Sequence, residues 1–138
     1  MKSKQLSDLH VTILEIARDF DVFCNENDIT YYLMGGSALG AMRHQGFIPW
    51  DDDFDVFMDS ANYHKFINVA KARLDKIKYY LQEEDTDEWP LFFSKIRMNN
   101  TTFIEQDVAQ LPIHHGIYID IMCLNNVFDN QLLRFLQY

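Results

Sequence analysis

The chain has 138 residues, of which 21 are acidic and 12 are Lys or Arg, so its formal net charge is −9. This excess of negative charge excludes a nucleic-acid backbone as the main partner, because affinity for that backbone comes mostly from Lys and Arg. Apolar residues make up 48% of the chain, with 11 Phe and 7 Tyr, which excludes disorder as the main state. We expect one compact domain over residues 1–138.

The sequence predicts neither a membrane span nor a secretion signal. No apolar run reaches the roughly 18 to 20 residues that cross a bilayer, and the N-terminus lacks the apolar stretch of a signal peptide. Cys24 and Cys123 lie far apart in apolar stretches, which favours buried free thiols over a disulfide. We therefore expect a cytoplasmic protein with no transmembrane segment.

The first half of the chain predicts two helices and two short strands. Apolar residues recur every three or four positions from Leu6 to Asn27, which is typical of an amphipathic helix. Tyr31–Met34 is predicted to be a short buried strand. It is followed by a turn at residues 35–37 and a helix from Ala38 to about His44. Phe54–Met58 is predicted to be the second strand.

The next segment predicts a helix, a strand and a loop. Ser60 is expected to cap a helix whose buried face runs from Tyr63 to Ile77 at helical spacing. Tyr79–Gln82 is expected to be a strand, and the acidic stretch from residue 83 to 88 is expected to be a solvated loop.

The last third predicts further strands, so the class is mixed α and β. Leu91–Met98 and Thr101–Glu105 are predicted to form a hairpin, because the two asparagines between them tolerate the positive φ of a tight turn. Ile117–Leu124 is predicted to be another strand, and Asp129 to cap a last helix.

Four aspartates lie within five residues, at positions 51, 52, 53 and 55. Such neighbouring carboxylates repel one another, so the fold must solvate them, protonate some of them or neutralise them with a cation. Residues two apart in a strand face the same side, so Asp53 and Asp55 would project together. This pair would suit Mg²⁺ or Mn²⁺, which prefer oxygen ligands. A surface strand cap without metal is the open alternative.

Two further features support a site for a phosphate ester bound to metal. Asp120 interrupts a strand of apolar residues, where an unpaired charge is costly, so we expect it to be the third carboxylate of the site. Gly35, Gly36 and Ser37 turn from a strand into a helix, which would leave backbone N–H groups and a hydroxyl facing phosphate oxygens. A glycine pair by itself usually marks only a turn.

The segment GGSALGAMRHQGFIPWDDDFDVFM, from Gly35 to Met58, resembles the most recognisable block of the LicD family of phosphocholine transferases, which is related to the fukutin-type proteins. Its glycine–serine turn and Asp-apolar-Asp pair also look like the signature of the nucleotidyltransferase superfold of the DNA polymerase β type. The segments FFSKIRMNNTTFIE and HGIYIDIM match the family in order, so the resemblance covers roughly Leu9 to Leu124.

The resemblance implies an α+β nucleotidyltransferase fold, with a mixed central sheet flanked by helices. It implies a metal-dependent transfer of phosphocholine from CDP-choline to a sugar of a cell-surface glycan or glycolipid, which would bring a cytoplasmic protein to the membrane. Asp53, Asp55 and Asp120 resemble the catalytic, metal-binding carboxylates, and Gly36 and Ser37 resemble the phosphate-binding turn. Because relatives usually extend further, the chain would be a catalytic core that lacks a C-terminal extension.

An acidic protein needs cationic side chains to bind a diphosphate donor. Arg43 follows the phosphate turn along its helix, and Lys95 and Arg97 alternate on one face of a strand, so these three are candidate donor-binding groups. An ordinary solvent-exposed charge is the alternative for each of them. Trp50, next to the aspartates, is the candidate for stacking on choline or on the base, with core packing as the alternative.

Two other functions stay open at this level. The same fold could transfer a nucleotide from a nucleoside triphosphate to a small molecule or a protein, or it could bind a nucleotide without catalysis. His114 and His115 lack a matching Cys or His spacing, so loop hydrogen bonds are expected of them rather than metal binding. The acceptor and the oligomeric state are not encoded in any pattern that we find.

Overall fold

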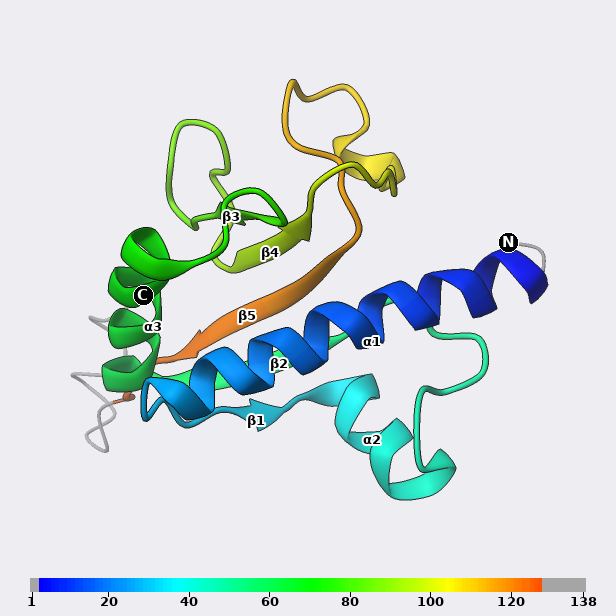
Figure 1. Cartoon of the computed structure of the whole chain (residues 1–138), viewed down its shortest axis with the longest axis horizontal. Helices are drawn as coiled ribbons and strands as arrows, with labels where there is room; N and C mark the ends of the chain where they lie inside the picture. The colour runs from blue at the N-terminus through cyan, green and yellow to red at the C-terminus, as the bar shows by residue number, and fades with distance from the viewer. Residues whose placement is uncertain (1–2, 128–138) are drawn as a thin grey trace.

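A computed structural model describes residues 3–127, which form helices and one β-sheet (Figure 1). The strands are β1 (Tyr32–Leu33), β2 (Asp55–Asp59), β3 (Tyr79–Gln82), β4 (Ser94–Met98) and β5 (Tyr118–Leu124). The helices are α1 (Ser3–Glu26), α2 (Gly35–His44), α3 (Ser60–Arg73) and a single 3₁₀ turn, η1 (Gln106–Val108). The predicted α+β class is confirmed.

The sheet is mixed, with the strand order β1-β2-β5-β4-β3. β2 and β5 run parallel, and the other neighbouring pairs run antiparallel. The central position therefore belongs to β5, which lies between β2 and β4. This arrangement brings Asp55 of β2 next to Asp120 of β5.

One face of the sheet carries the hydrophobic core. α1 lies along this face, and its apolar residues point inward at the predicted helical spacing. α3 packs on the same face, where the Tyr63 hydroxyl hydrogen-bonds Ser94 Oγ of β4 at 2.6 Å. The core residues with almost no exposed surface include Ile13, Ile16, Val56, Met58, Phe66, Ile119 and Ile121. Burial of each such side chain contributes about 1.5 to 3 kcal/mol, which holds the helices to the sheet.

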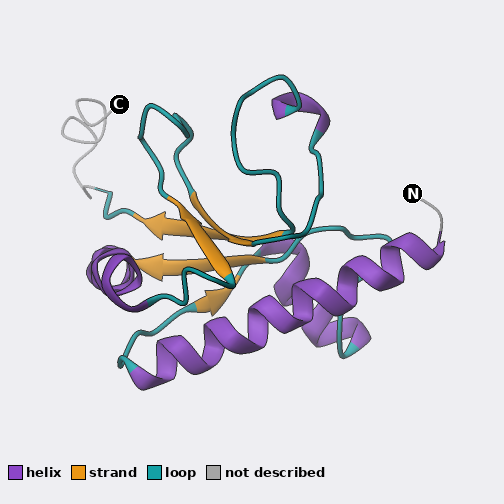
Figure 2. Ribbon diagram, turned by 45° about the horizontal axis from the view of Figure 1, so that its top comes forward, coloured by secondary structure: helices purple, strands orange, loops and turns teal. Residues whose placement is uncertain are grey.

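The opposite face of the sheet is polar. Because side chains alternate along a strand, Asp55, Lys95 and Asp120 point away from the core while their neighbours point into it. Figure 2 shows α1 on one side of the strands and two long loops, residues 83–93 and 99–117, on the other. These loops bury part of the polar face, so some of its charges are removed from water.

The predicted hairpin of Leu91–Met98 with Thr101–Glu105 is wrong. β4 already has β3 on one side and β5 on the other, so no free edge is left for the residues that follow it. Thr101–Glu105 instead belongs to the loop before β5, where Phe103 N donates to His115 O at 2.7 Å. The turn itself is as expected, because Asn100 adopts a φ of 60°.

Two element boundaries also differ from the prediction. β1 is reduced to two residues, and Tyr32 is 57% exposed rather than buried, because β1 is an edge strand that pairs only with β2. α2 begins at Gly35, so the glycines form the first turn of the helix and do not precede it.

The start and end of α3 correct two further expectations. Its N-cap is Asp59, whose Oδ1 accepts from Asn62 N at 2.8 Å, so Ser60 is the first helical residue and not the cap. Ile77 is 87% exposed because the helix ends at Arg73 and the chain then turns away.

Three remaining expectations concern the membrane, the cysteines and the end of the chain. Within residues 3–127, no helix combines the length and apolar composition of a bilayer span. Cys24 is buried and Cys123 half-buried, and both are free thiols, as predicted. The helix predicted from Asp129 lies outside the described residues.

Candidate active site

The pairing of β2 with β5 places two of the predicted carboxylates side by side. Asp55 is the register partner of Asp120, so their side chains project from neighbouring strands on the same face of the sheet. Asp120 N donates to the Phe54 carbonyl at 2.9 Å, which fixes this register at the start of β2. A parallel pair can form only through a long connection, and here it joins residues 65 positions apart.

The first turn of α2 is attached directly to this pair. Asp55 N donates a hydrogen bond to Ser37 Oγ at 2.9 Å, and Ser37 is buried. The Ser37 hydroxyl accepts this bond, and no residue between positions 3 and 127 is seen to accept its proton. The first N–H groups of a helix have no partner within the helix, so the start of α2 offers donors beside the carboxylates.

Two glycines allow this close approach. Gly35 has a φ of +48°, a conformation that side chains rarely adopt. A Cβ atom at Gly36 would overlap Asp51 Oδ2, so the carboxylate of Asp51 can lie against α2 only because residue 36 has no side chain. The two glycines therefore let the aspartates lie close to the helix, Gly35 through its backbone conformation and Gly36 through the absence of a side chain.

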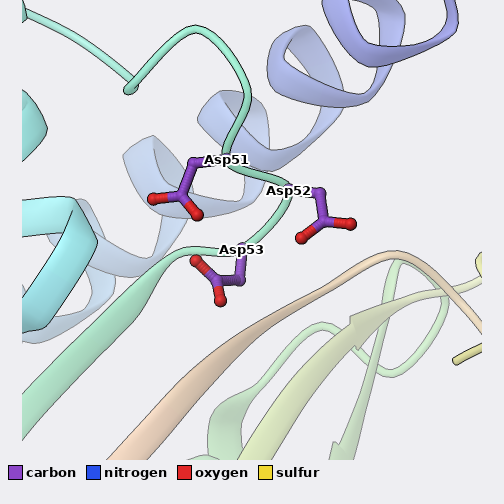
Figure 3. A group of neighbouring side chains, drawn as sticks. All are labelled: Asp51, Asp52 and Asp53. Carbon is purple, nitrogen blue, oxygen red and sulfur yellow. The ribbon is translucent and has the colours of Figure 1, made fainter. Parts of the chain in front are cut away.

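The aspartates before β2 form a compact group. Asp51, Asp52 and Asp53 each have a carboxylate oxygen within 4.8 Å of the other two, and Figure 3 shows them projecting from one short stretch of backbone. Asp52 is exposed, whereas Asp51 and Asp53 are half-buried. α1 supports this stretch from behind, because His10 stacks on Phe47 and hydrogen-bonds the backbone oxygen of Asp51.

The electrostatics join these aspartates into one negatively charged group. Burial, and then the neighbouring charges of Asp55 and Asp51, raise the pKa of Asp53 to about 6. Burial and the charge of Asp120 likewise raise the pKa of Asp55 to about 6. Burial also raises the pKa of Asp120 to about 6, although Lys95 acts in the opposite direction. The raised pKa values mean that the negative charge here is not fully compensated by the protein.

This group meets the requirements for a divalent cation. The donors are carboxylate oxygens, which suit Mg²⁺ or Mn²⁺. Asp120 Oδ1 is buried and forms an ion pair with Lys95 Nζ at 2.9 Å, so a cation that bound this oxygen would compete with Lys95. Asp53, Asp55 and Asp120 are thus brought together, as the sequence led us to expect, and Asp51 joins them.

Lys95 lies inside the site and is not a surface charge. Its side chain is 1% exposed, and its Nζ lies 2.9 Å from Asp120 Oδ1, close enough for an ion pair but not aligned as a hydrogen bond. Nζ also donates to Glu105 Oε1 at 3.3 Å. Three aromatic rings surround the ammonium group. Its distances to the ring centroids are 3.3 Å for Tyr118, 5.1 Å for Phe93 and 5.5 Å for Trp89.

Arg97 lies next to Lys95 and is also fully buried, so the solvent-exposed alternative is wrong for both residues. Its guanidinium donates to Gln82 Oε1 at 2.8 Å, to Gly116 O at 3.0 Å and to Glu105 Oε2 at 3.3 Å. Burial opposes ionisation of Glu105, but Lys95, Tyr118 and Arg97 outweigh this effect and lower its pKa. Arg97 is therefore occupied by protein groups.

Two predicted residues lie apart from the carboxylates. Arg43 is exposed in the last turn of α2, about two turns from the glycines, and the described residues give it no hydrogen bond to the aspartates. Trp50 is 77% exposed, with its ring edge-on to His44 at 6.3 Å. As expected, His114 and His115 form loop hydrogen bonds, to Asn99 and to Leu111 O.

Sequence reasoning missed Glu105 and His10. Glu105 was assigned to a strand, and no spacing connects it with Asp120, because the 99–117 loop alone brings it back to the sheet. His10 is one polar residue in an amphipathic helix, 41 positions before the backbone oxygen that it contacts. Neither residue has a signal in the sequence that would distinguish it from a surface charge.

A cavity adjoins this site. It has a volume of about 360 Å³ and lies between α1, α2 and the 45–54 loop. Ser37 and Asp51 form its polar end, and Leu14, Phe47 and Ile48 are among its apolar walls. The site thus combines charged groups with an apolar recess of a size that a small ligand could occupy.

The region that contains the candidate site is also the region that is similar to known proteins. The family model described as LicD/FKTN/FKRP, nucleotidyltransferase domain, matches residues 28–123, which include all the predicted site residues and the described strands except the last residue of β5, Leu124. The lipopolysaccharide cholinephosphotransferase LicD of Haemophilus influenzae is 44% identical over 69 residues, which is 50% of this chain. An uncharacterized protein of Rickettsia typhi is 39% identical over 72 residues, also 50% of this chain.

A more distant relative is the mannosyltransferase regulator 4 of Saccharomyces cerevisiae, which is 25% identical over 111 residues, or 75% of this chain. The aligned segments cover 26%, 23% and 9% of the Haemophilus, Rickettsia and yeast proteins, so the chain spans about a quarter or less of these relatives.

Proposed function

Since the chain belongs to the LicD/FKTN/FKRP family, we propose that it is the nucleotidyltransferase-fold core of an enzyme that transfers phosphocholine from CDP-choline to a sugar of a cell-surface glycan or glycolipid. The observation that carries this proposal is the convergence of Asp55, Asp120 and the Ser37 hydroxyl near the start of the parallel strand pair β2–β5. The likeness to a lipopolysaccharide cholinephosphotransferase supports the choice of donor group and acceptor class.

The proposed reaction is a substitution at the phosphorus that carries choline. The acceptor's hydroxyl oxygen forms a bond to this phosphorus, the bond from phosphorus to the bridging oxygen of the diphosphate breaks, and cytidine monophosphate leaves. The proton of the hydroxyl passes to a carboxylate of the site. We expect this to occur in the cytoplasm, with the membrane approached only through a lipid-linked acceptor.

The residues of the chain have distinct roles in this proposal. Asp53, Asp55 and Asp120 would hold Mg²⁺ or Mn²⁺, which supplies positive charge to the phosphate oxygens when bound. Ser37 and the first N–H groups of α2 donate hydrogen bonds to the diphosphate. Lys95 contributes positive charge from within the sheet, and Arg97 fixes the loop that carries Glu105. Trp50 and Arg43 remain candidates for contact with choline and with the donor, reached from the solvent side.

Nucleotidyl transfer is the alternative function, and the name of the matched domain also suggests it. The two reactions differ in the phosphate that is attacked: phosphocholine transfer occurs at the phosphate that carries choline, and nucleotidyl transfer at the phosphate next to the nucleoside. The test incubates the chain with Mg²⁺ and lipopolysaccharide, with either CDP-choline or a mixture of nucleoside triphosphates. Release of cytidine monophosphate together with choline-labelled lipopolysaccharide is the expected result. Release of pyrophosphate would support a nucleotidyltransferase instead.

Asp52→Asn is the matched control, because Asp52 belongs to the same group but is exposed. Turnover should persist in Asp52→Asn and disappear in Asp55→Asn. If neither donor is consumed while nucleotide still binds the chain, the catalytic proposal is wrong and a nucleotide-binding domain remains.

A further inference from the structure

Lys95 stands between two carboxylates that belong to different parts of the chain. Its Nζ lies 2.9 Å from Asp120 Oδ1, on the neighbouring strand, and 3.3 Å from Glu105 Oε1, on the 99–117 loop. Asp120 is a carboxylate of the proposed cation site, whereas Glu105 is not. The Lys95 ammonium group is therefore shared between the proposed cation site and the 99–117 loop.

The surroundings of Lys95 keep it in this position. Its side chain is 1% exposed, and the rings of Tyr118, Phe93 and Trp89 lie around the ammonium group. Cation–π contacts of this kind stabilise a cation that has been removed from water. Lys95 consequently cannot exchange its carboxylate partners for solvent, and its charge stays with Asp120 and Glu105.

Glu105 is positioned to hold the Lys95 ammonium group when Asp120 binds another cation. Its two oxygens contact different cations, Oε1 facing Lys95 and Oε2 facing Arg97. The four groups Lys95, Arg97, Glu105 and Asp120 carry two positive and two negative charges. A divalent cation that binds Asp120 would add positive charge to this balanced set, beside an ammonium group that is already there.

We propose that Lys95 is a resident counter-ion that neutralises Asp120 until a divalent cation binds there, and that Glu105 is the second partner which then holds Lys95. This inference rests on the cation site of the proposed function. Lys95 is a positioning residue in this scheme: it orients Asp120 before a divalent cation binds, and it opposes cation binding. The two variants below should therefore change the cation affinity in opposite directions.

The first test removes the competing charge. Lys95→Met retains a flexible side chain that suits aromatic walls but has no positive charge. Titration of the chain with Mn²⁺, followed by the electron paramagnetic resonance of the free ion, should show about tenfold tighter binding than wild type. A merely structural role for Lys95 predicts the reverse, because a disturbed site binds its cation more weakly.

The second test removes the alternative partner. Glu105→Gln leaves Lys95 with Asp120 as its one acidic partner, so the Mn²⁺ affinity should fall by about fivefold. Glu105→Gln is nearly isosteric, and its weaker binding supports the inference when its melting temperature matches that of wild type. Unchanged or tighter binding in Glu105→Gln would overturn the inference even where Lys95→Met does not fold. Lys95→Arg retains the charge and should stay within about twofold of wild type.

Lys71→Met is the matched control, because it removes the same charge from an exposed ion pair with Glu83 on another part of the surface. Its Mn²⁺ affinity should stay within about twofold of wild type. Equal affinities of wild type, Lys95→Met and Glu105→Gln would overturn the inference and leave the proposed function intact. Absence of Mn²⁺ binding in the wild-type chain would overturn both.

Discussion

Two charged regions meet at Asp120, and they differ in how their charge is compensated. The aspartate group, Asp51, Asp52, Asp53 and Asp55, contains no positive side chain, and the pKa values of Asp53 and Asp55 are raised to about 6. The ion network of Lys95, Arg97, Glu105 and Asp120 is buried more deeply and is electrically balanced. The first region therefore has no counter-charge of its own, whereas the second contains two cations for its two carboxylates.

This difference indicates that the aspartate group binds a ligand and that the ion network stabilises the surrounding loops and strands. A buried charge without its counter-charge is costly, so a fold retains such a group where a ligand supplies the compensation. A balanced buried network fixes the loops and strands around it, at little net gain in stability. Asp120 belongs to both regions. Substitution of its partner Lys95 can therefore distinguish the role of Asp120 in cation binding from its role in the ion network.

The largest effect is expected on turnover at the aspartate group. Asp55→Asn removes a negative charge that faces Asp120, and we expect roughly a thousandfold loss of phosphocholine transfer, because charge stabilisation at the reacting phosphate depends on this carboxylate. The melting temperature should be unchanged or higher, since repulsion is relieved. Cytidine monophosphate release and thermal melting measure the two effects. Wild-type turnover would remove Asp55 from the mechanism.

A substitution in the ion network should lower the free energy of unfolding. Arg97→Met leaves Glu105 with one cation and deprives Gly116 O of its donor, so we expect unfolding to become easier by about 3 to 5 kcal/mol. Urea denaturation measures this change, and Asp53→Asn is the comparison from the aspartate group, with no loss expected. A loss below about 1 kcal/mol in Arg97→Met would show that the network is not a support.

The raised pKa of the aspartate group should make the folded state less stable as the pH rises. The native pKa of Asp53 is about 6, against an ordinary value of 3.8, so between these values the folded state binds more protons than the unfolded state. The free energy of unfolding therefore falls as pH rises through this window. Without divalent cations, we expect the melting temperature to be about 5 °C higher at pH 5 than at pH 7.5.

Two controls isolate this effect. Burial lowers the pKa of His114, which acts in the opposite direction near pH 6, so the informative quantity is the difference between wild type and Asp53→Asn. The variant should show a flatter pH dependence. At pH 7.5, Mg²⁺ should restore part of the lost stability to wild type by binding the folded state, and less of it to the variant. Identical curves for both proteins would contradict the assignment.

The smallest effect is expected where the two regions are joined to α2. In Gly36→Ala the new Cβ displaces the end of the Asp51 side chain, which can rotate, and alanine favours the helix. We expect the melting temperature to stay within about 2 °C of wild type and the Mn²⁺ affinity to fall about threefold. Gly46→Ala is the control, because a Cβ atom at Gly46 would meet only the His44 backbone oxygen, at an ordinary contact distance of 4.0 Å. A large loss of stability in Gly36→Ala alone would mean that Asp51 is rigidly held.

Prediction from the sequence succeeded where a local pattern carries the information. The spacing of apolar residues located α1 and α3, and alternation along β2 and β5 placed Asp55 and Asp120 away from the core. It failed where partners are decided at a distance. Thr101–Glu105 has the composition of a strand, yet the edge that it would need is occupied by β5.

The sequence by itself determined which residues are apolar, which carboxylates lie two positions apart and where glycine permits a close approach, because these depend only on neighbours along the chain. The tertiary structure decided which charges are compensated. From the sequence, Lys95 and Arg97 could be either donor-binding groups or surface cations, and only the two loops that cover them show that both are buried. Glu105 gains its role only where the 99–117 loop returns it to them. Compensation of charge depends on distance and burial, and both are set by chain segments that are remote in sequence.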